Sequence, residues 1–183
     1  MIKKWETLER RKVDNFKIFD LEWIKRRHPD WGKVSEFVVL NSASWVNIIP
    51  ITKEGNVILI EQYRHGTDEI TLEVPGGLVE KDEDPKDAGE RECFEETGYK
   101  GKGCAKLLGT NIPNPAFINN KCFSYLWIDC EKVGTQHLDG HEDIKVIEVP
   151  LKNIKKMILE GKIQHSLVLT AFFFYFLEYS DLS

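Results

Sequence analysis

Several features that assign a chain to a common class of protein are missing from this sequence. Its 183 residues contain four cysteines, with no CxxC pair and no zinc-binding spacing among them. The formal net charge is −5 and lysine and arginine form no long basic block, which argues against a general nucleic-acid binder. Internal repeats, low-complexity tracts and evident linkers are absent too. We therefore expect an ordinary globular chain whose thiols are reduced.

Long apolar runs are also scarce. The most apolar run covers residues 167–177 and is too short to cross a bilayer, which needs about 20 apolar residues. The first sixteen residues are partly basic and lack the apolar core of a signal peptide. We expect a cytoplasmic protein with no membrane contact, in which residues 167–177 form a core helix or a helix half-buried at a subunit contact.

The composition, 42% hydrophobic and 30% charged, is typical of globular proteins. Residues 1–44 alternate weakly between apolar and polar, which predicts two or three antiparallel strands. Because a few strands alone are marginally stable, we expect this N-terminal strand region to pack against something else. We expect residues 45–183 to form the second domain.

The pattern after residue 44 predicts strands followed by a helix, twice over. Further strands are predicted at 45–50, 56–63, 71–74, 122–128 and 144–149, and helices at 152–160 and 166–179. This order predicts an α+β fold in which a mixed β-sheet lies between helices.

One more helix is predicted within residues 76–99, the most informative stretch of the chain. Gly76 and Gly77 follow an apolar run and allow a close-packed turn. Asp84 is suited to the N-cap of a helix and Pro85 to its first position. Gly98 is suited to the left-handed position that ends the helix.

Three carboxylates share one face of this predicted helix. At about 100° per residue, Glu95 and Glu96 lie within about 60° of Glu92 on either side. The face is either solvated or a site for a hard divalent cation such as Mg²⁺ or Mn²⁺, which prefers carboxylate oxygen. In the second case the Gly76 carbonyl could complete the coordination.

The spacing within residues 76–99 resembles the Nudix box of the Nudix hydrolases. Its seven fixed positions match Gly77, Glu83, Arg91, Glu92, Glu95, Glu96 and Gly98, while Cys93 and Tyr99 occupy positions that are usually aliphatic. The resemblance implies a Nudix-type fold and a metal held by Glu92, Glu95, Glu96 and the Gly76 carbonyl. It implies that Arg91 braces the loop by pairing with Glu83, so we assign Gly77, Glu83, Arg91 and Gly98 structural roles.

Hydrolysis also needs a base to deprotonate the attacking water. In the family this is a box glutamate, Glu95 or Glu96 here, or an acid from a later loop. Residues 137–143 resemble that loop, and we predict Glu142 as the base, with Asp139 in reserve; the alternative is an acidic surface loop. His137 and His141 fit exposed loop positions better than metal ligands.

Substrate contacts are predicted at three positions. Arg64, at a strand end, could bind the diphosphate or form a surface salt bridge. Glu73 could accept hydrogen bonds from sugar hydroxyls. Pro115, or Pro113, resembles a proline that marks the ADP-ribose hydrolysers, although Pro-Asn-Pro is also a good turn. Trp23, Trp31 and Trp45 fit core packing better than an adenine platform.

The sequence thus predicts an ADP-ribose pyrophosphatase-like Nudix enzyme. We expect it to hydrolyse ADP-ribose to AMP and ribose 5-phosphate with Mg²⁺ or Mn²⁺. A nucleotide-sugar diphosphatase acting on GDP-mannose or ADP-glucose is the closest alternative, and a non-catalytic nucleotide sensor is a remote one. The resemblance also implies a homodimer formed through the N-terminal strands.

Overall fold

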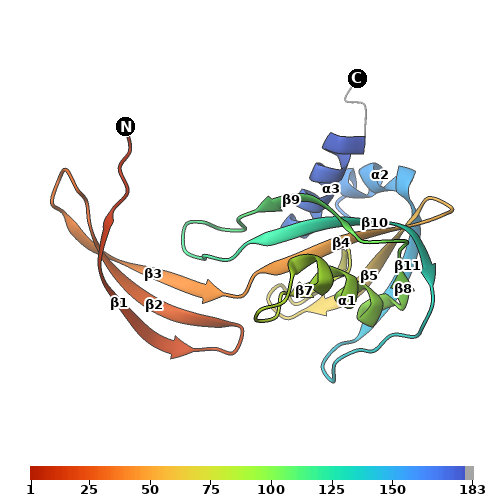
Figure 1. Ribbon diagram of the computed structural model, residues 1–183, viewed down its shortest axis with the longest axis horizontal. Helices are drawn as coiled ribbons and strands as arrows, with labels where there is room; N and C mark the ends of the chain where they lie inside the picture. Colours follow the sequence, from red (N-terminus) through yellow and green to blue (C-terminus); the bar gives the residue numbers. More distant parts are fainter. Residues whose placement is uncertain (180–183) are drawn as a thin grey trace. The chain divides into compact units, whose positions relative to one another are not determined.

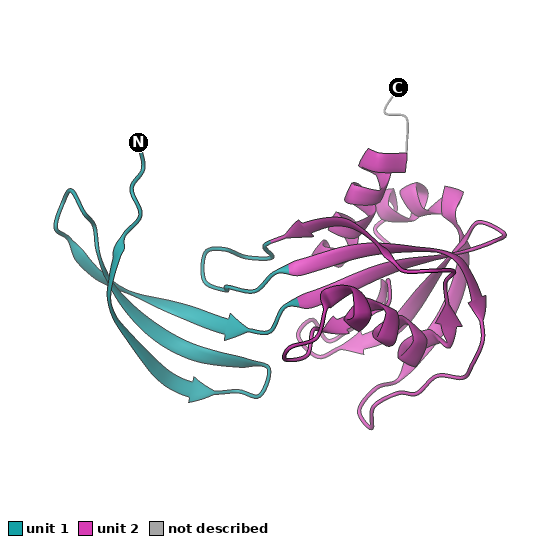
Figure 2. Cartoon of the chain, viewed as in Figure 1, with its two compact units in different colours: residues 1–44, 112–121 teal, residues 45–111, 122–183 magenta. Residues whose placement is uncertain are grey.

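The computed structural model describes residues 1–179 and divides them into two compact units. The first unit contains residues 1–44 together with residues 112–121, and the second contains the rest of the chain (Figure 2). The domain division predicted from the sequence, residues 1–44 and 45–183, stays a prediction. The ten-residue segment 112–121 was expected in the second domain, so each unit is described separately below.

The first unit is a three-stranded antiparallel sheet in the order β1–β2–β3. Its strands are β1 (Glu6–Asn15), β2 (Phe19–Arg27) and β3 (Val34–Ser42). The segment 112–121 joins it because the Leu40 amide donates to the Phe117 carbonyl at 2.7 Å, and the Asn119 amide donates to the Leu40 carbonyl at 3.2 Å. This backbone pairing, which spacing along the chain does not reveal, explains why the segment leaves the second unit.

The second unit is built on a mixed sheet. Its strands are β4 (Trp45–Thr52), β5 (Asn56–Arg64), β6 (Glu69–Glu73), β7 (Gly76–Leu78), β8 (Tyr99–Lys100), β9 (Lys106–Asn111), β10 (Cys122–Lys132) and β11 (Ile144–Pro150). The sheet runs in the order β11–β5–β4–β10–β8, with β6, β7 and β9 paired to β5, β4 and β10. The pairing of β4 with β10 is parallel and the others are antiparallel, so the predicted mixed sheet is confirmed.

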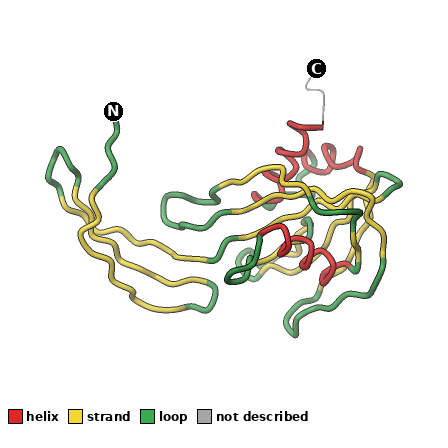
Figure 3. The backbone as a smooth tube through the Cα atoms, viewed as in Figure 1, coloured by secondary structure: helices red, strands yellow, loops and turns green. Residues whose placement is uncertain are grey.

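Helices cover both faces of this sheet. The helices are α1 (Pro85–Thr97), α2 (Ile154–Leu159), which follows the 3-10 turn η1 (Leu151–Asn153), and α3 (Ser166–Tyr179). Figure 1 shows α1 on one face and α2 with α3 on the other, and Figure 3 shows the loops that join them. The predicted α+β arrangement is confirmed. Among residues 1–179, no helix is long and apolar enough to span a membrane.

Strand β4 supplies the core on both sides, because successive side chains point to opposite faces. Val46 and Ile48 pack with Ala88 and Cys93 of α1. Ile49 belongs to the second cluster, with Phe172 of α3. By the same alternation Asn47 lies on the α3 face, next to Ile49, where its polar side chain interrupts an otherwise apolar strand.

Candidate active site

Helix α1 begins and ends as the sequence predicts. The Asp84 carboxylate accepts a hydrogen bond from the Lys86 amide at 2.8 Å, and Pro85 occupies the first turn. Gly98 ends the helix with φ of 75°, and a side chain there would collide with the Gly134 carbonyl. A side chain at Gly77 would meet the Glu92 carboxylate, which would have to turn aside. Gly98 therefore lets the segment at Gly134 pass close to the end of the helix, and Gly77 leaves room for the Glu92 carboxylate.

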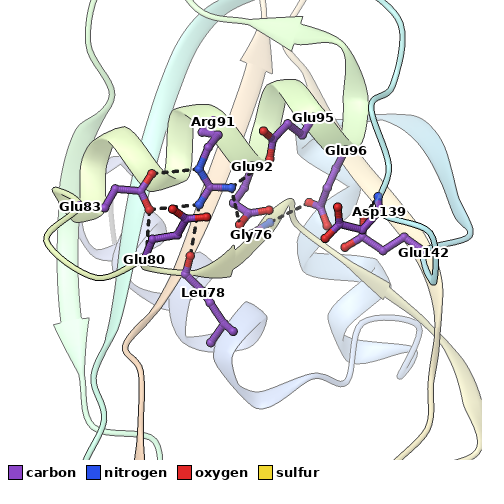
Figure 4. A network of polar contacts seen from close by, with 10 residues as sticks. All are labelled: Gly76, Leu78, Glu80, Glu83, Arg91, Glu92, Glu95, Glu96, Asp139 and Glu142. Atoms are coloured by element: carbon purple, nitrogen blue, oxygen red, sulfur yellow. Dashed lines mark hydrogen bonds and ion pairs between the residues drawn. The ribbon is translucent and has the colours of Figure 1, made fainter. Parts of the chain in front are cut away.

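Arg91 ties the loop before α1 to the helix itself (Figure 4). Its Nε and Nη2 donate to the two carboxylate oxygens of Glu83 at 2.9 and 3.1 Å, and Nη2 donates to the Leu78 carbonyl at 3.3 Å. Its Nη1 donates to Glu92 and to Glu95, both at 2.9 Å. The expected pairing of Arg91 with Glu83 is therefore present, and it extends to two of the box acids.

The carboxylate of the third acid, Glu96, is stabilised by far fewer hydrogen bonds and positive charges. Its residue is only 3% exposed, and one oxygen accepts a hydrogen bond from the Gly76 amide at 2.9 Å. Burial raises the pKa of Glu96 well above its ordinary value despite this hydrogen bond, and the nearby Glu92 and Glu142 carboxylates add to the rise. Burial also raises the pKa of Glu92, although Arg91 opposes the effect. A cation bound at this face would stabilise the ionised form of both carboxylates and so oppose the rise in both pKa values.

The later acidic loop lies against the same helix. Gln136 donates through Nε2 to the Glu96 carbonyl at 2.7 Å and to the Ile144 carbonyl at 2.9 Å, and the His137 amide donates to the Glu95 carbonyl at 2.7 Å. Beyond these anchors, the Asp139 amide donates to the Glu142 carboxylate at 2.9 Å. Figure 4 shows both acids close to Glu96, so the structure brings the predicted base into the site.

These side chains line a cavity of about 480 Å³ with a large excess of negative charge. Its acids are Glu80, Glu92, Glu95, Glu96, Asp139 and Glu142, and its cationic side chains are Arg64 and Arg91. Both arginines already bind carboxylates. Six carboxylates facing two committed guanidiniums favour the entry of a further positive charge.

The donor set suits a hard divalent cation. Arg91 and Gly76 engage only one oxygen of each box acid, so Glu92 Oε2, Glu95 Oε1 and Glu96 Oε1 accept no hydrogen bond from the described residues. Within residues 1–179, no three histidine, cysteine or acidic side chains already converge on one point as a ligand set. Binding would therefore require these carboxylates to turn toward the ion. The predicted ligand role of the Gly76 carbonyl stays a prediction.

A second cavity, of about 540 Å³, adjoins the first and shares Trp45, Arg64 and Gly76 with it. Arg64 donates to both oxygens of Glu73, at 2.7 and 2.8 Å, and Thr71 donates to one of them at 2.6 Å. The two predicted substrate residues therefore bind each other. Arg64 is therefore in a salt bridge, as the alternative had it, but a partly buried one, with the Arg64 side chain 33% exposed and that of Glu73 4% exposed.

The remaining predicted residues fall in different places. Pro115 belongs to the first unit, where it lines a cavity with Trp5 and Phe37, and its substrate role stays a prediction. His137 and His141 are exposed, as expected for loop residues. Trp31 is 74% exposed, so it does not pack in a core, whereas Trp45 lines both of the cavities described above.

Sequence reasoning missed Asn47, Gln136 and His165. Asn47 and His165 line the second cavity, and Gln136 anchors the acidic loop. A signal existed for Asn47 alone, since it is a polar residue inside an apolar strand. Gln136 and His165 lie in segments with no pattern, and only the folded backbone places their side chains.

Comparisons with known proteins agree with this geometry. The family model described as the NUDIX domain matches residues 43–171. An ADP-ribose pyrophosphatase of Bacillus subtilis is 27% identical over 84% of this chain and 82% of its own length. A methanol dehydrogenase activator of Bacillus methanolicus is 30% identical over 74% of this chain and 73% of its own. A crystal structure of an ADP compounds hydrolase has the same fold, with a TM-score of 0.82 at 19% identity over 96% of this chain and 94% of its own.

Proposed function

The chain belongs to the Nudix family of hydrolases, and from that premise we propose that it cleaves the diphosphate bond of ADP-ribose to give AMP and ribose 5-phosphate. The family match confirms the resemblance drawn from residues 76–99. The substrate is inferred from the ADP-ribose pyrophosphatase that matches this chain over most of both lengths. The resemblance implies that turnover needs a divalent cation.

One observation carries the proposal: three acids of α1 each keep one carboxylate oxygen that accepts no hydrogen bond from residues 1–179, at the wall of a strongly acidic cavity. We propose that Glu92, Glu95 and Glu96, with the Gly76 carbonyl, hold Mg²⁺ or Mn²⁺. When bound, such an ion neutralises charge on the phosphoryl oxygens and lowers the pKa of a water molecule.

The protein's own residues then have distinct roles. Arg91 and Glu83 fix the loop that carries Gly76 and Gly77, which keeps the acidic face in place. We assign proton removal from the attacking water to Glu142, with Asp139 or a box glutamate as alternatives. The water oxygen bonds to one phosphorus while the bond from that phosphorus to the bridging oxygen breaks. We also propose that Arg64, which lines both cavities and donates to Glu73 through Nε and Nη2, binds the diphosphate through its remaining group, Nη1.

A substrate panel tests the assignment. Purified protein is given ADP-ribose, ADP-glucose and GDP-mannose, each with Mg²⁺ and with Mn²⁺, and the nucleoside monophosphate released is measured. We expect the highest kcat/KM with ADP-ribose and no release in EDTA. Faster release from a nucleotide sugar would assign the enzyme to the nucleotide-sugar diphosphatases. Binding of all three without release from any would indicate a non-catalytic sensor.

We further propose that the enzyme is a homodimer of the cytoplasm. Every residue of β1 is exposed in the single chain, and the first unit exposes Leu8, Val13, Phe16 and Ile18. A three-stranded sheet this exposed needs a covering surface to be stable, and a second copy of the chain supplies one. The four cysteines are unpaired, three of them buried, which agrees with a reducing compartment.

A further inference from the structure

A groove between α2 and α3 is lined mainly by apolar side chains and stays open to solvent. The two helices lie on the same face of the sheet (Figure 1), and the hollow between them has a volume of about 610 Å³. Two of its lining side chains are strongly exposed, Leu159 of α2 at 88% and Phe173 of α3 at 58%. Contiguous apolar side chains that remain this exposed mark an interaction surface.

The composition of α3 indicates that its outer face has a partner of its own. Of residues 167–177, only Thr170 is not hydrophobic. A helix that is apolar all round is normally buried all round. Phe172 on the inner face is fully buried in the core, whereas Phe173 and Leu177 on the outer face are exposed. Within residues 1–179, the fold therefore covers one apolar side of α3 and leaves the other uncovered.

The spacing of the groove residues suits a third helix. Leu169, Phe173 and Phe176 stand at i, i+4 and i+7 along α3, so they form one ridge on its surface. Ile158 and Leu159 of α2 form the opposite wall. A groove between two helical ridges accepts the ridge of another helix, and peptides bound in this way place their apolar anchors at the same spacing. The shape of the groove therefore favours an amphipathic helix over a flat surface.

The rim of the groove is basic, although the chain as a whole has a net charge of −5. Helix α2 and the turns on either side of it contain four lysines and one acid, Glu160. Two of the lysines share Glu160. The other two, Lys152 and Lys155, form no salt bridge within residues 1–179, and Lys155 Nζ lies 4.9 Å from the centre of the Phe176 ring, which lines the groove. Two cations are therefore available to the carboxylates of a partner.

This charge distribution decides between three candidate occupants. A second copy of the chain, related by twofold symmetry, would bring its own lysines to the same rim, and like charges across an interface repel. Anionic membranes are bound by clusters of about four to eight lysines or arginines, whereas two lysines are free here, and a bilayer has no ridge to fill a groove. A helix with carboxylates beside its apolar face matches both the charge and the shape.

We propose that the groove between α2 and α3 is a docking site for an acidic amphipathic helix of a partner protein. The apolar anchors of that helix pack between Leu159 and Phe173, and its carboxylates pair with Lys152 and Lys155. The groove shares no lining residue with the acidic cavity or with the second cavity. The inference therefore does not rest on the proposed hydrolase function, and a docked helix leaves the box acids accessible.

Three fluorescently labelled peptides of about 18 residues, or five helical turns, test the proposal against the full chain. The first repeats leucine at i, i+3, i+4 and i+7 with glutamate and alanine between. The second has lysine in place of every glutamate, and the third has the composition of the first in an order that breaks the leucine stripe. Fluorescence anisotropy measures binding. We expect the acidic helix to bind at least about tenfold more tightly than the other two, and to weaken as salt screens the charges.

Two variants of the groove should weaken binding of the acidic peptide about tenfold or more. Phe173→Ser removes an apolar anchor, and Lys155→Glu reverses a charge at the rim. Their matched controls, which should bind like the wild type, are Ile128→Ser and Lys132→Glu, because both residues are exposed on β10 and do not line the groove. Lys155→Glu should also bind the lysine peptide more tightly than the wild type does, a reversal that a damaged fold would not produce.

Several results would overturn the partner helix. The first is a wild type that binds the acidic peptide no more tightly than the lysine peptide or the reordered one. The second is a full chain that sediments as a dimer and becomes monomeric in Phe173→Ser, because a second copy would then cover the groove. The third is binding to phosphatidylserine vesicles that Phe173→Ser abolishes and the acidic peptide does not compete with, because the occupant would then be a membrane.

The hydrolase assignment fails or stands separately. Phe173→Ser should release AMP from ADP-ribose at the rate of the wild type, because Phe173 lines neither of the two cavities near α1 and β6. A wild type that releases no AMP but binds the acidic peptide as expected would leave the docking site intact and remove the ADP-ribose assignment.

Discussion

Glu96 shows at the residue scale how the fold prepares a site for a cation. A carboxylate this buried is normally paired with a basic side chain, yet among the described residues it receives one backbone amide from Gly76. The nearest guanidinium on α1, that of Arg91, is bound to Glu83, Glu92 and Glu95 instead. The charge left at Glu96 is therefore available to a ligand.

Glu96→Gln should lower kcat by about 100-fold or more without unfolding the protein, because the amide keeps the side-chain shape and loses the charge. Steady-state kinetics with Mg²⁺ measure the loss, and circular dichroism checks the fold. Asp87→Asn is the control, since Asp87 is an exposed acid in the first turn of the same helix. Near-normal turnover by Glu96→Gln would remove Glu96 from the metal site.

The pKa of Glu73 is shifted in the opposite direction to that of Glu96. Burial raises it, but the hydrogen bonds from Arg64 and Thr71 outweigh burial and lower it below the ordinary 4.5. A carboxyl whose pKa is lower in the folded state stabilises the fold above its unfolded pKa, and this stabilisation is lost as the pH falls through the folded value. Glu73→Gln should therefore reduce the free energy of unfolding by about 3 kcal/mol at pH 7.

The difference in unfolding free energy between wild type and Glu73→Gln should narrow below pH 4.5. Urea denaturation at a series of pH values measures it, with Glu69→Gln as the control, because Glu69 lies on the same strand and is exposed. A difference that stays constant with pH would show that the charge of Glu73 is not the source of its effect.

The parts of the site that lie on one helix could be predicted from the sequence, because residue type and spacing are enough to place them. The shared face of Glu92, Glu95 and Glu96 follows from helical periodicity alone, and the pairing of Arg91 with Glu83 followed from the family motif. The ion pair of Arg64 with Glu73 could not be predicted, because it joins two strands whose register depends on the turn between them. Each residue looked free to bind substrate until its partner was known.

At the scale of elements, α1 and the loop 137–143 act as the two sides of the acidic cavity. The helix bounds were predictable because Asp84, Pro85 and Gly98 are strong local signals. The resemblance implied that the loop approaches the box acids, but spacing along the chain did not show what holds it there: Gln136, which bridges the carbonyls of Glu96 and Ile144, and the His137 amide. Gln136 is therefore a positioning residue for Asp139 and Glu142.

Gln136→Leu should release the loop 137–143 while leaving the sheet intact. Hydrogen exchange of residues 137–143 should increase, and kcat should fall about tenfold, because the acids are no longer held near α1. The control is Thr170→Val, since the Thr170 hydroxyl also donates to a backbone carbonyl, that of Ser166, but lies in α3 and lines neither the acidic cavity nor the second cavity. Unchanged hydrogen exchange of residues 137–143 would show that the other hydrogen bonds, such as that of the His137 amide, hold the loop without Gln136.

At the scale of the whole molecule, the two units differ sharply in how much of their apolar surface is buried. The second unit has two apolar clusters, one on each face of its sheet, whereas β1 of the first unit is exposed along its full length. The strand region before residue 45 was predictable from weak alternation. That residues 112–121 belong to the first unit could not be predicted, because it depends on long-range backbone pairing with Leu40.

A chain that begins at Trp45 should be monomeric or unstable, whereas the full chain should sediment as a dimer, because the first unit carries the surface that we expect to be shared. Analytical ultracentrifugation at several concentrations distinguishes the two. A full chain that sediments as a compact monomer would contradict the dimer without affecting the hydrolase assignment.

The wall formed by Trp45, Arg64 and Gly76 has a practical consequence for protein engineering. Because the same three side chains and backbone groups border both cavities, exchanging any of them would disturb turnover and selectivity together. Redesign of the second cavity should therefore begin at residues that line it and not the acidic cavity, such as Gln164 and Leu167, where a library can be varied while the box acids are left untouched.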